Sequence, residues 1–551
     1  STTHRRNVLA LRKLQQACAA VKGESGTEGE QVFNDQFFHA LSQILPLKRR
    51  ESCAEKIIKF VASFLQFAQE KDASMQRGER SVAGSDAMDV DSKDEGDASA
   101  AEETITERLV AYLIRRLLPG LNAKDKNVRF RVCQLLALVV GFVGELDEDL
   151  FEMFLRGMLD RVRDKEPSIR VQAVLALAKL QHAATPIMIL TVPTRASDVR
   201  RAAVLNLACD EATCGDLLKR SRDIDAITRR FTFVKPMSNI GDFRMLSIEQ
   251  REQLIKSGLS ERDASVKSAC ITMLLYQWLP HADNNLLEFL KRLDVMNTEV
   301  ARQVLEELFL SHPEITQGVE FNDEFWEDLS PEGVLFFRVY LEYCHKNDPE
   351  RFEALLPNIT GHALQIQRYS RRMIEAEERN EEDEVDSYEF ITVQLITIAK
   401  YLDYADEMGR RKMFSLLRDL LLLSSIDERT ISLVLSVLRK LTVDDRDFTR
   451  VIVEVLSEIR GAAEDESDEA DSVLERQLQC LSIARGAFET LQTLEEQSPM
   501  EAILTEIIHP AIQSTEPDVR EAGIQCLGLY CVLDKARSKK EEERERNRGS
   551  M

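Results

Sequence analysis

A helical unit recurs along this chain and restricts the folds that are open to it. Each copy has an apolar helix, a short turn with Asp, Asn or Pro, and then Val or Ile followed by Arg or Lys at the start of a second apolar helix. In the five clearest copies the basic residue is Arg129, Arg170, Arg200, Lys267 or Arg520. One helix pair leaves its apolar face uncovered, so the pairs must stack in series. The sequence therefore predicts an all-α chain built from stacked helix pairs.

The spacing of the copies indicates the type of repeat. Arg129 and Arg170 are 41 residues apart, and Arg170 and Arg200 are 30 residues apart. Helix pairs with a period near 40 residues are typical of HEAT repeats. We expect a HEAT-repeat α-solenoid, a superhelical stack of antiparallel helix pairs whose concave surface is available to a long partner.

Motifs of enzymes and of metal sites do not occur in the sequence. It contains no GxxxxGK[ST], GxGxxG, GxSxG or HExxH, and no nucleophile stands at a recognisable spacing from a base. The ten cysteines are scattered, and the nearest pairs, Cys209 with Cys214 and Cys526 with Cys531, do not have zinc-ligand spacing. We expect a non-catalytic binding protein of a reducing compartment, with no cofactor and no metal.

Charge is distributed very unevenly along the chain. The total is −23, yet residues 1–69 carry +4 and residues 104–270 carry +6, whereas residues 70–103 carry −7 and the remainder carries −26. A basic part beside an acidic part suggests that the first faces a polyanion, while the second maintains solubility or contacts a basic partner.

Composition and periodicity also divide the chain. The segment 70–103 is rich in Asp, Ser, Gly and Ala, and it has too few apolar residues to offset the entropy of ordering. The expected divisions are an N-terminal helical segment at 1–69, a disordered acidic insertion at 70–103, HEAT repeats with a basic track at 104–312, irregular helices with an acidic loop at 313–389, HEAT repeats at 390–460, an acidic loop at 461–472, a HEAT repeat at 473–533 and a charged flexible tail at 534–551.

The basic residue of each repeat has a structural interpretation that we favour. Its side chain is placed to bond turn carbonyls and the Asp of the neighbouring repeat, which forms a ladder through the solenoid. Arg129, Arg170, Arg200 and Arg520 are therefore weak indicators of a ligand.

The cations beyond this ladder are more informative. Lys48, Lys56 and Lys59 share one polar face of an expected helix, although a solvated helix face explains that pattern equally well. Corresponding turns of a stacked solenoid lie along one edge, so cations in these turns predict a basic track. The candidate DNA-binding residues are Lys48, Arg49, Arg50, Lys56, Lys124, Lys126, Lys219, Arg220, Arg222, Arg229 and Arg230.

The chemistry of this track favours one type of ligand. Point charges without interleaved aromatic residues are suited to phosphate contacts rather than to reading bases or stacking on single strands. Double-stranded DNA bound without sequence preference is the ligand that we predict.

The repeats also resemble a known family. NVRFRVCQLLALVVG, RVRDKEPSIRVQAVLALAKLQ, DVRRAAVLNLA, LLKRSRDIDAITRRF, MLSIEQREQLIKSGLSERDASVKSAC, FLKRLDVMNTEV and VQLITIAKYLDYADEMGRRKM, in this order, are similar to the HEAT-repeat subunit of condensin known as condensin subunit 3. The resemblance covers most of the chain, and it implies that family members continue with further repeats beyond residue 551.

The resemblance implies a harp-shaped solenoid bound to the kleisin subunit. Together they would clasp duplex DNA by its sugar-phosphate backbone during mitotic chromosome condensation in the nucleus. The SMC ATPases would be contacted through the kleisin. In interphase the resemblance also allows a cytoplasmic location. The DNA role carries over to Lys48, Arg49, Arg50, Lys219, Arg220, Arg222, Arg229 and Arg230, and further to Lys124 and Lys126. Some apolar anchors for the kleisin are expected among Leu416, Leu417, Leu420, Leu421, Val434 and Leu438, although most of these side chains are expected to be core.

One alternative remains open at this point. A HEAT-repeat transport receptor or a phosphatase-type scaffold would use its concave face to bind a basic protein. The acidic total favours this alternative, whereas the basic first half opposes it.

Overall fold

The fold is described from a computed structural model of the chain. The structure describes residues 2–21, 27–83, 103–142, 147–180, 195–297, 299–316, 320–423, 426–461, 470–491 and 500–548. These residues form helices and turns and contain no strand, and the chain divides into unit 1, Ser1–Asp283, and unit 2, Asn284–Met551. None of the described helices is long and apolar enough to cross a membrane.

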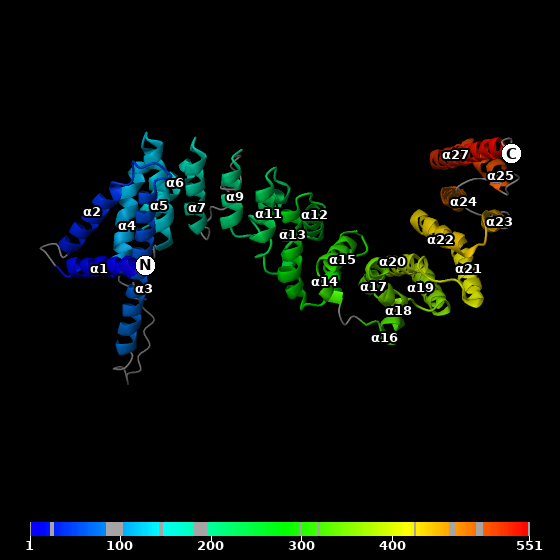
Figure 1. Cartoon of the computed structure of the whole chain (residues 1–551), viewed down its shortest axis with the longest axis horizontal. Coiled ribbons are helices and arrows are strands. Elements are labelled where there is room, and N and C mark those ends of the chain that lie inside the picture. The colour runs from blue at the N-terminus through cyan, green and yellow to red at the C-terminus, as the bar shows by residue number, and fades with distance from the viewer. Residues whose placement is uncertain are drawn as a thin grey trace. The chain divides into compact units, whose positions relative to one another are not determined.

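Unit 1 is a stack of helix pairs. Its α-helices are α1 (Thr2–Ala19), α2 (Glu28–Ser42), α3 (Ser52–Ala83), α4 (Ile105–Leu117), α5 (Lys126–Val139), α6 (Glu148–Val162), α7 (Pro167–Leu177), α9 (Ser197–Asn206), α10 (Cys214–Leu218), α11 (Ala226–Val234), α12 (Ile248–Leu259) and α13 (Ala264–Met273). The second helices of successive repeats, α5, α7, α9, α11 and α13, contact one another in chain order (Figure 1). The predicted all-α solenoid of HEAT-type helix pairs is confirmed.

Four of the five second helices described in unit 1 begin at a residue suited to starting a helix, the exception being α9, whose N-cap is Ala196. Asp125, Asp225 and Asp263 are the N-caps of α5, α11 and α13, and each carboxylate accepts a hydrogen bond from a backbone N–H of the first turn. Helix α7 instead begins with Pro167. Proline lacks a backbone N–H, but an N–H in the first turn of a helix has no acceptor within the helix, so no hydrogen bond is lost. The turn residues of the sequence repeat therefore set where these four helices start.

Unit 2 continues with the same construction. Its α-helices are α14 (Leu286–Lys291), α15 (Val300–Ser311), α16 (Asp323–Glu327), α17 (Pro331–Asn347), α18 (Pro349–Leu355), α19 (Ile359–Arg379), α20 (Glu382–Ala399), α21 (Glu407–Leu421), α22 (Glu428–Leu441), α23 (Asp445–Gly461), α24 (Ala470–Thr490), α25 (Met500–Ile503), α26 (His509–Ile512) and α27 (Pro517–Arg548). Helices α17, α20, α22, α24 and α27 form a contact series like that of unit 1.

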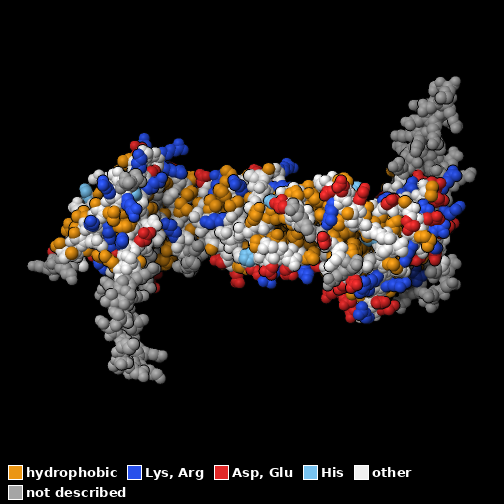
Figure 2. All heavy atoms as spheres, turned by 60° about the horizontal axis from the view of Figure 1, so that its bottom comes forward, with side chains coloured by type: hydrophobic (Ala, Val, Ile, Leu, Met, Phe, Trp, Pro, Cys, Tyr) orange, Lys and Arg blue, Asp and Glu red, His pale blue; other side chains and the backbone are white. Residues whose placement is uncertain are grey.

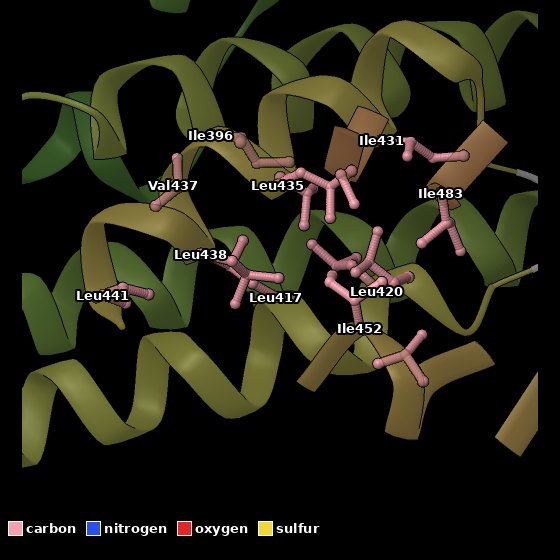
Figure 3. Packing of buried hydrophobic residues seen from close by; sticks show 14 of the residues in the cluster. Ile396, Leu417, Leu420, Ile431, Leu435, Val437, Leu438, Leu441, Ile452 and Ile483 are labelled. Carbon is pink, nitrogen blue, oxygen red and sulfur yellow. The ribbon is translucent and has the colours of Figure 1, made fainter. Parts of the chain in front are cut away.

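The apolar residues that the sequence suggested as kleisin anchors are buried in the core of unit 2. Figure 3 shows Leu417, Leu420 and Leu438 directed into the packed layer between helices. All six suggested anchors are at most 8% exposed: Leu416, Leu417, Leu420, Leu421, Val434 and Leu438. The expectation that some of them serve as anchors is wrong, because all six side chains fill helix–helix interfaces and none is open to a partner.

Several predicted boundaries are also wrong. Helix α3 continues to Ala83, past the expected start of a disordered insertion at residue 70. The acidic run near residue 380 is not a loop, because α19 ends at Arg379 and α20 begins at Glu382. Asn380 between them adopts the left-handed conformation, which asparagine tolerates, so the chain reverses within two residues. Helix α27 extends through the expected flexible tail to Arg548. Residues 84–102 and 462–469 lie outside the described residues.

A buried histidine joins two helices of unit 2. His362 of α19 is 1% exposed, and its Nε2 donates to the Leu395 carbonyl of α20 at 2.8 Å. Burial lowers the pKa of this imidazole to about 4, although the bond to the carbonyl opposes the shift. The side chain therefore packs as a neutral ring at neutral pH.

Mild acid should weaken unit 2 through His362. The unfolded histidine binds a proton near pH 6.5, whereas the folded one does so only near 4, so stability is constant above 6.5 and falls as the pH drops between these values. The expected loss is about 1.4 kcal/mol per pH unit in this window. Urea unfolding followed by helical circular dichroism at pH 7 and pH 5 measures it.

The matched control is His362→Gln, whose amide N–H can still donate to Leu395 but does not titrate. The difference between the two pH values should shrink in this variant. An equal pH dependence in both proteins would show that His362 is not the responsible group.

Candidate nucleic-acid interface

Arginine side chains tie the turn of one repeat to the turn of the next. Arg129 donates through Nη1 to the carbonyls of Ala123 and Lys124, both at 2.9 Å. Its Nε donates to Oδ2 of Asp164, in the following turn, at 2.9 Å. The ladder predicted from the repeat is confirmed at this position.

The same pattern recurs in other repeats. Nη1 of Arg170, Arg229 and Arg520 also donates to the carbonyls five and six residues earlier. Arg200 pairs with Asp223 at 2.7 Å, and Arg229 pairs with Glu261, so these links again reach the following turn. We call Arg129, Arg170, Arg200, Arg229 and Arg520 the ladder arginines.

The carboxylates of the ladder are held in their charged form. Burial alone raises the pKa of Asp164, but the hydrogen bonds from Arg129 and from the Glu166 amide outweigh this effect and leave the pKa below its ordinary value. The pKa of Asp223 shows the same balance between burial and the bonds to Arg200 and the Asp225 amide. The ladder is therefore an ionic structure at neutral pH.

The turns of unit 1 also share an exposed side chain at one repeated position. The residue five positions before the basic residue of each repeat is exposed in every described repeat of unit 1. These residues form the edge row, which consists of Lys124, Lys165, Arg195, Ile224 and Arg262. Four of the five are cations, and none of the four has a side-chain ion pair among the described residues. Ile224 is 97% exposed and interrupts the row.

The predicted cluster at residues 219–230 lies beside the edge row, but its members differ in availability. Lys219, Arg220 and Arg222 belong to the short 3-10 helix η4 (Lys219–Arg222), directly before the turn that carries Ile224. Lys219 pairs with Asp216 at 2.7 Å. Arg222 is exposed without an ion pair in the described part of the chain, as is Arg230 on α11.

Two of the predicted contacts are used inside the fold. Arg229 is a ladder arginine with a side chain 19% exposed, so its guanidinium is already bonded to Glu261 and to two carbonyls. Arg220, with a side chain 31% exposed, approaches Asp223 at 3.6 Å. The sequence did not distinguish these two arginines from the free cations, because Arg220 and Arg229 stand close to such cations in the chain.

The N-terminal cluster occupies a turn rather than a helix. Helix α3 begins at Ser52, so Lys48, Arg49 and Arg50 precede it, contrary to the expected helix start at Lys48. All three are exposed, and the Arg49 guanidinium lies 5.6 Å from the centre of the Phe130 ring. Lys56 is exposed on the first turns of α3.

Arg131 fixes this turn from beneath, and it was not among the residues predicted from the sequence. Its side chain is fully buried, yet Nη2 donates to the carbonyls of Lys48 at 2.6 Å and of Arg49 at 3.0 Å. Nη1 pairs with Glu55 at 2.6 Å and donates to Gln134 at 2.7 Å. A charged residue on the apolar face of the helix NVRFRVCQLLALV was the signal that could have revealed it.

The other predicted lysines lie in the same part of the molecule. Lys124 belongs to the edge row, and Lys126 is exposed but pairs with Glu166 at 3.3 Å. Figure 2 shows Lys and Arg side chains spread over the visible face at the N-terminal end of unit 1. Every predicted site residue lies within unit 1.

Comparison with known proteins shows the family. Condensin complex subunit 3 of Schizosaccharomyces pombe is 30% identical over 561 residues, which is 92% of this chain and 60% of the relative. The Saccharomyces cerevisiae protein of the same name is 30% identical over 627 residues, covering 96% of this chain and 58% of the relative. This chain belongs to the condensin subunit 3 family. It spans about 60% of the length of these relatives.

A family model and a solved structure agree with this assignment. The model of the nuclear condensing complex subunits, C-terminal domain, matches residues 479–542. The crystal structure of the S. pombe condensin Cnd3-Cnd2 subcomplex is similar with a TM-score of 0.78 and 30% identity, over 95% of this chain and 65% of that one. Membership of the condensin family supports the condensin interpretation over the transport-receptor or scaffold alternative.

Breaking one rung of the ladder should destabilise unit 1. Arg129→Met leaves the buried carboxylate of Asp164 without its main partner and frees two turn carbonyls, so we expect a loss of about 2 kcal/mol in the free energy of unfolding. Urea unfolding followed by circular dichroism measures this loss.

Lys124→Met in the same turn is the control, because its side chain is exposed and should change stability by less than about 0.5 kcal/mol. Equal effects of the two substitutions would remove the ladder from its structural role.

Proposed function

We propose that this chain is the non-catalytic subunit of condensin that holds double-stranded DNA by sequence-independent contacts to the sugar-phosphate backbone. The observation that carries the proposal is the edge row with its flanking cations. Lys124, Lys165, Arg195 and Arg262 stand at one repeated position. Ladder arginines bond the backbone carbonyls of the first three, and Arg229 pairs with Glu261 in the turn of Arg262. A repeated row of exposed charges suits a ligand whose own charges repeat.

The neighbouring cations extend this surface. Arg222 and Arg230 flank the edge row in the compressed repeats, and Lys48, Arg50 and Lys56 form a second group at the N-terminal end. Phosphate contacts of this kind position a duplex without reading its bases. We therefore assign Arg229 to the fold and the exposed cations to DNA.

The second partner in this proposal is the kleisin subunit. The S. pombe relative was solved as a Cnd3-Cnd2 subcomplex, and we take Cnd2 to be the kleisin that the family resemblance implies. A chain that holds DNA by charge alone releases it quickly in salt, so a kleisin segment closing over the DNA would make the hold durable. The SMC ATPases would then be reached through the kleisin, and the complex would act in the nucleus on chromosomes during mitosis.

Salt dependence tests the DNA contacts. About six phosphate contacts predict a log–log slope near −5 for affinity against salt, with little difference between random and repetitive duplexes. Lys48→Ala combined with Arg50→Ala removes two contacts and should reduce the slope by about 2. Fluorescence anisotropy with a labelled duplex at several salt concentrations measures both quantities.

The matched control is Lys346→Ala combined with Arg429→Ala, which makes the same charge change at exposed positions of unit 2. This variant should keep the slope of the unmodified chain. A slope near zero for the unmodified chain, or an equal change in the two variants, would refute the proposed DNA surface.

Arg131 should affect DNA binding only through the turn that it holds. Arg131→Lys keeps the charge but removes the planar fork that bonds the carbonyls of Lys48 and Arg49, so the turn should lose its fixed geometry. We expect weaker DNA binding in the unmodified background and no further loss when Lys48 and Arg50 are already alanine. This double-mutant cycle is measured by the same anisotropy assay.

Thermal unfolding of all four proteins separates this role from simple destabilisation, since a folding defect lowers the melting temperature in both backgrounds. Additive losses of DNA affinity would show that Arg131 does not act through Lys48 and Arg50.

A further inference from the structure

Two cysteine sulfurs meet in the connection between α9 and α10. The Sγ atoms of Cys209 and Cys214 lie 2.8 Å apart. Cys214 is buried, whereas Cys209 is only partly buried. Most of the other cysteines in the described part of the chain are buried singly in helix interfaces.

The backbone around the pair is already fixed. Thr213 is fully buried, and its hydroxyl donates to the Ala208 carbonyl at 2.7 Å. The Thr213 amide donates to Oδ1 of Asp210 at 2.9 Å, and the Asp210 amide donates back to the Thr213 hydroxyl at 3.1 Å. These bonds hold the neighbours of both cysteines, so the sulfurs are brought together by the folded turn rather than by chance encounter.

The two thiols are chemically unequal. The hydrogen bond that Cys209 donates lowers the pKa of Cys214, although burial opposes the shift. The same hydrogen bond, together with burial, raises the pKa of Cys209. Cys214 is therefore the better stabilised thiolate, and Cys209 is the more exposed residue of the pair.

We propose that Cys209 and Cys214 form a dithiol modification site that disulfide-class oxidants, such as glutathione disulfide, close into an intrachain disulfide. The site does not depend on the proposed DNA surface, because it rests on two thiols outside that surface. It lies at the start of α10, whose C-cap is Lys219, so the new bond would tie down the segment that leads into η4.

The reaction proceeds by two exchange steps. Cys209 passes its proton along the hydrogen bond to the Cys214 thiolate and attacks one sulfur of glutathione disulfide, which forms a mixed disulfide and expels one glutathione thiolate. The expelled thiolate takes up the proton from Cys214. The Cys214 thiolate then attacks the Cys209 sulfur and expels the second glutathione. The two protein thiols lose two electrons and two protons in total, and glutathione disulfide is reduced to two molecules of glutathione.

The chain contains a matched pair for comparison. Cys526 and Cys531 have the same separation in sequence, with one member buried and the other exposed. They lie on the helix α27, where residues five apart face different directions, and the Cys526 sulfur is directed to the Leu481 carbonyl at 3.3 Å. Sequence spacing is thus equal in the two pairs, and only the folded geometry differs.

Peptide mapping tests the proposal on the intact folded chain. After treatment with glutathione disulfide and alkylation of free thiols, trypsin releases residues 202–219 and residues 521–535, each of which contains one complete pair. The first peptide should lose two hydrogens and resist alkylation. The second should remain a dithiol or carry glutathione on Cys531. Closure of both pairs at equal rates, or glutathione left on Cys209 as the final product, would overturn the proposal.

Single substitutions check the order of the steps. Cys214→Ser should accumulate glutathione on Cys209, because the attacking second thiolate is missing. Cys209→Ser should leave Cys214 largely unmodified, because its sulfur is buried. Rapid modification of Cys214 in the second variant would contradict the assigned order, and circular dichroism confirms that each variant is folded.

Discussion

The planar fork of an arginine at the start of the second helix is the interaction on which unit 1 depends. In Arg129, Nη1 donates to two backbone carbonyls of its own turn, while Nε of the same guanidinium donates to the Asp164 carboxylate of the next turn. A lysine offers a single point charge and cannot satisfy both directions at once. The group therefore closes each turn and sets the register between repeats with one side chain. Because it also neutralises a buried carboxylate, the turns remain rigid without a large apolar core of their own.

The ladder divides the cations of unit 1 into two classes. Arg129, Arg200 and Arg229 are bonded within the fold, whereas the edge row points to solvent from the same turns. Arg131 has a comparable role at the N-terminal end. Its fully buried guanidinium donates to the backbone carbonyls of the exposed basic turn at Lys48 and Arg49. Net charge alone does not describe such a surface, since the availability of each cation depends on what its guanidinium or ammonium group already contacts.

Unit 2 differs from unit 1 in where its leucines and its acidic residues lie. Its leucines fill a continuous layer between helices, as Leu417 and Leu438 illustrate, and its acidic residues near position 380 are placed on helices rather than in a loop. The basic surface that we propose for DNA is therefore a property of unit 1, and the family relationship adds a second chain, the kleisin, to the proposed assembly. A partner that contacts unit 2 must use surface other than the buried leucines, because these side chains are already enclosed.

The sequence by itself determined the all-α repeat architecture, because apolar periodicity and the turn residues before each Arg are local signals. It also determined the family and the basic region, since the quoted motifs and the charge blocks are visible without coordinates. Only the tertiary structure decided that Arg229 belongs to the ladder while Arg230 is exposed, that Leu438 is core, and that Arg131 supports the turn at Lys48. The physical reason is that these roles depend on contacts between residues distant in the chain, such as Arg131 with Lys48, and local sequence carries no record of which of two adjacent arginines meets a carboxylate from another repeat.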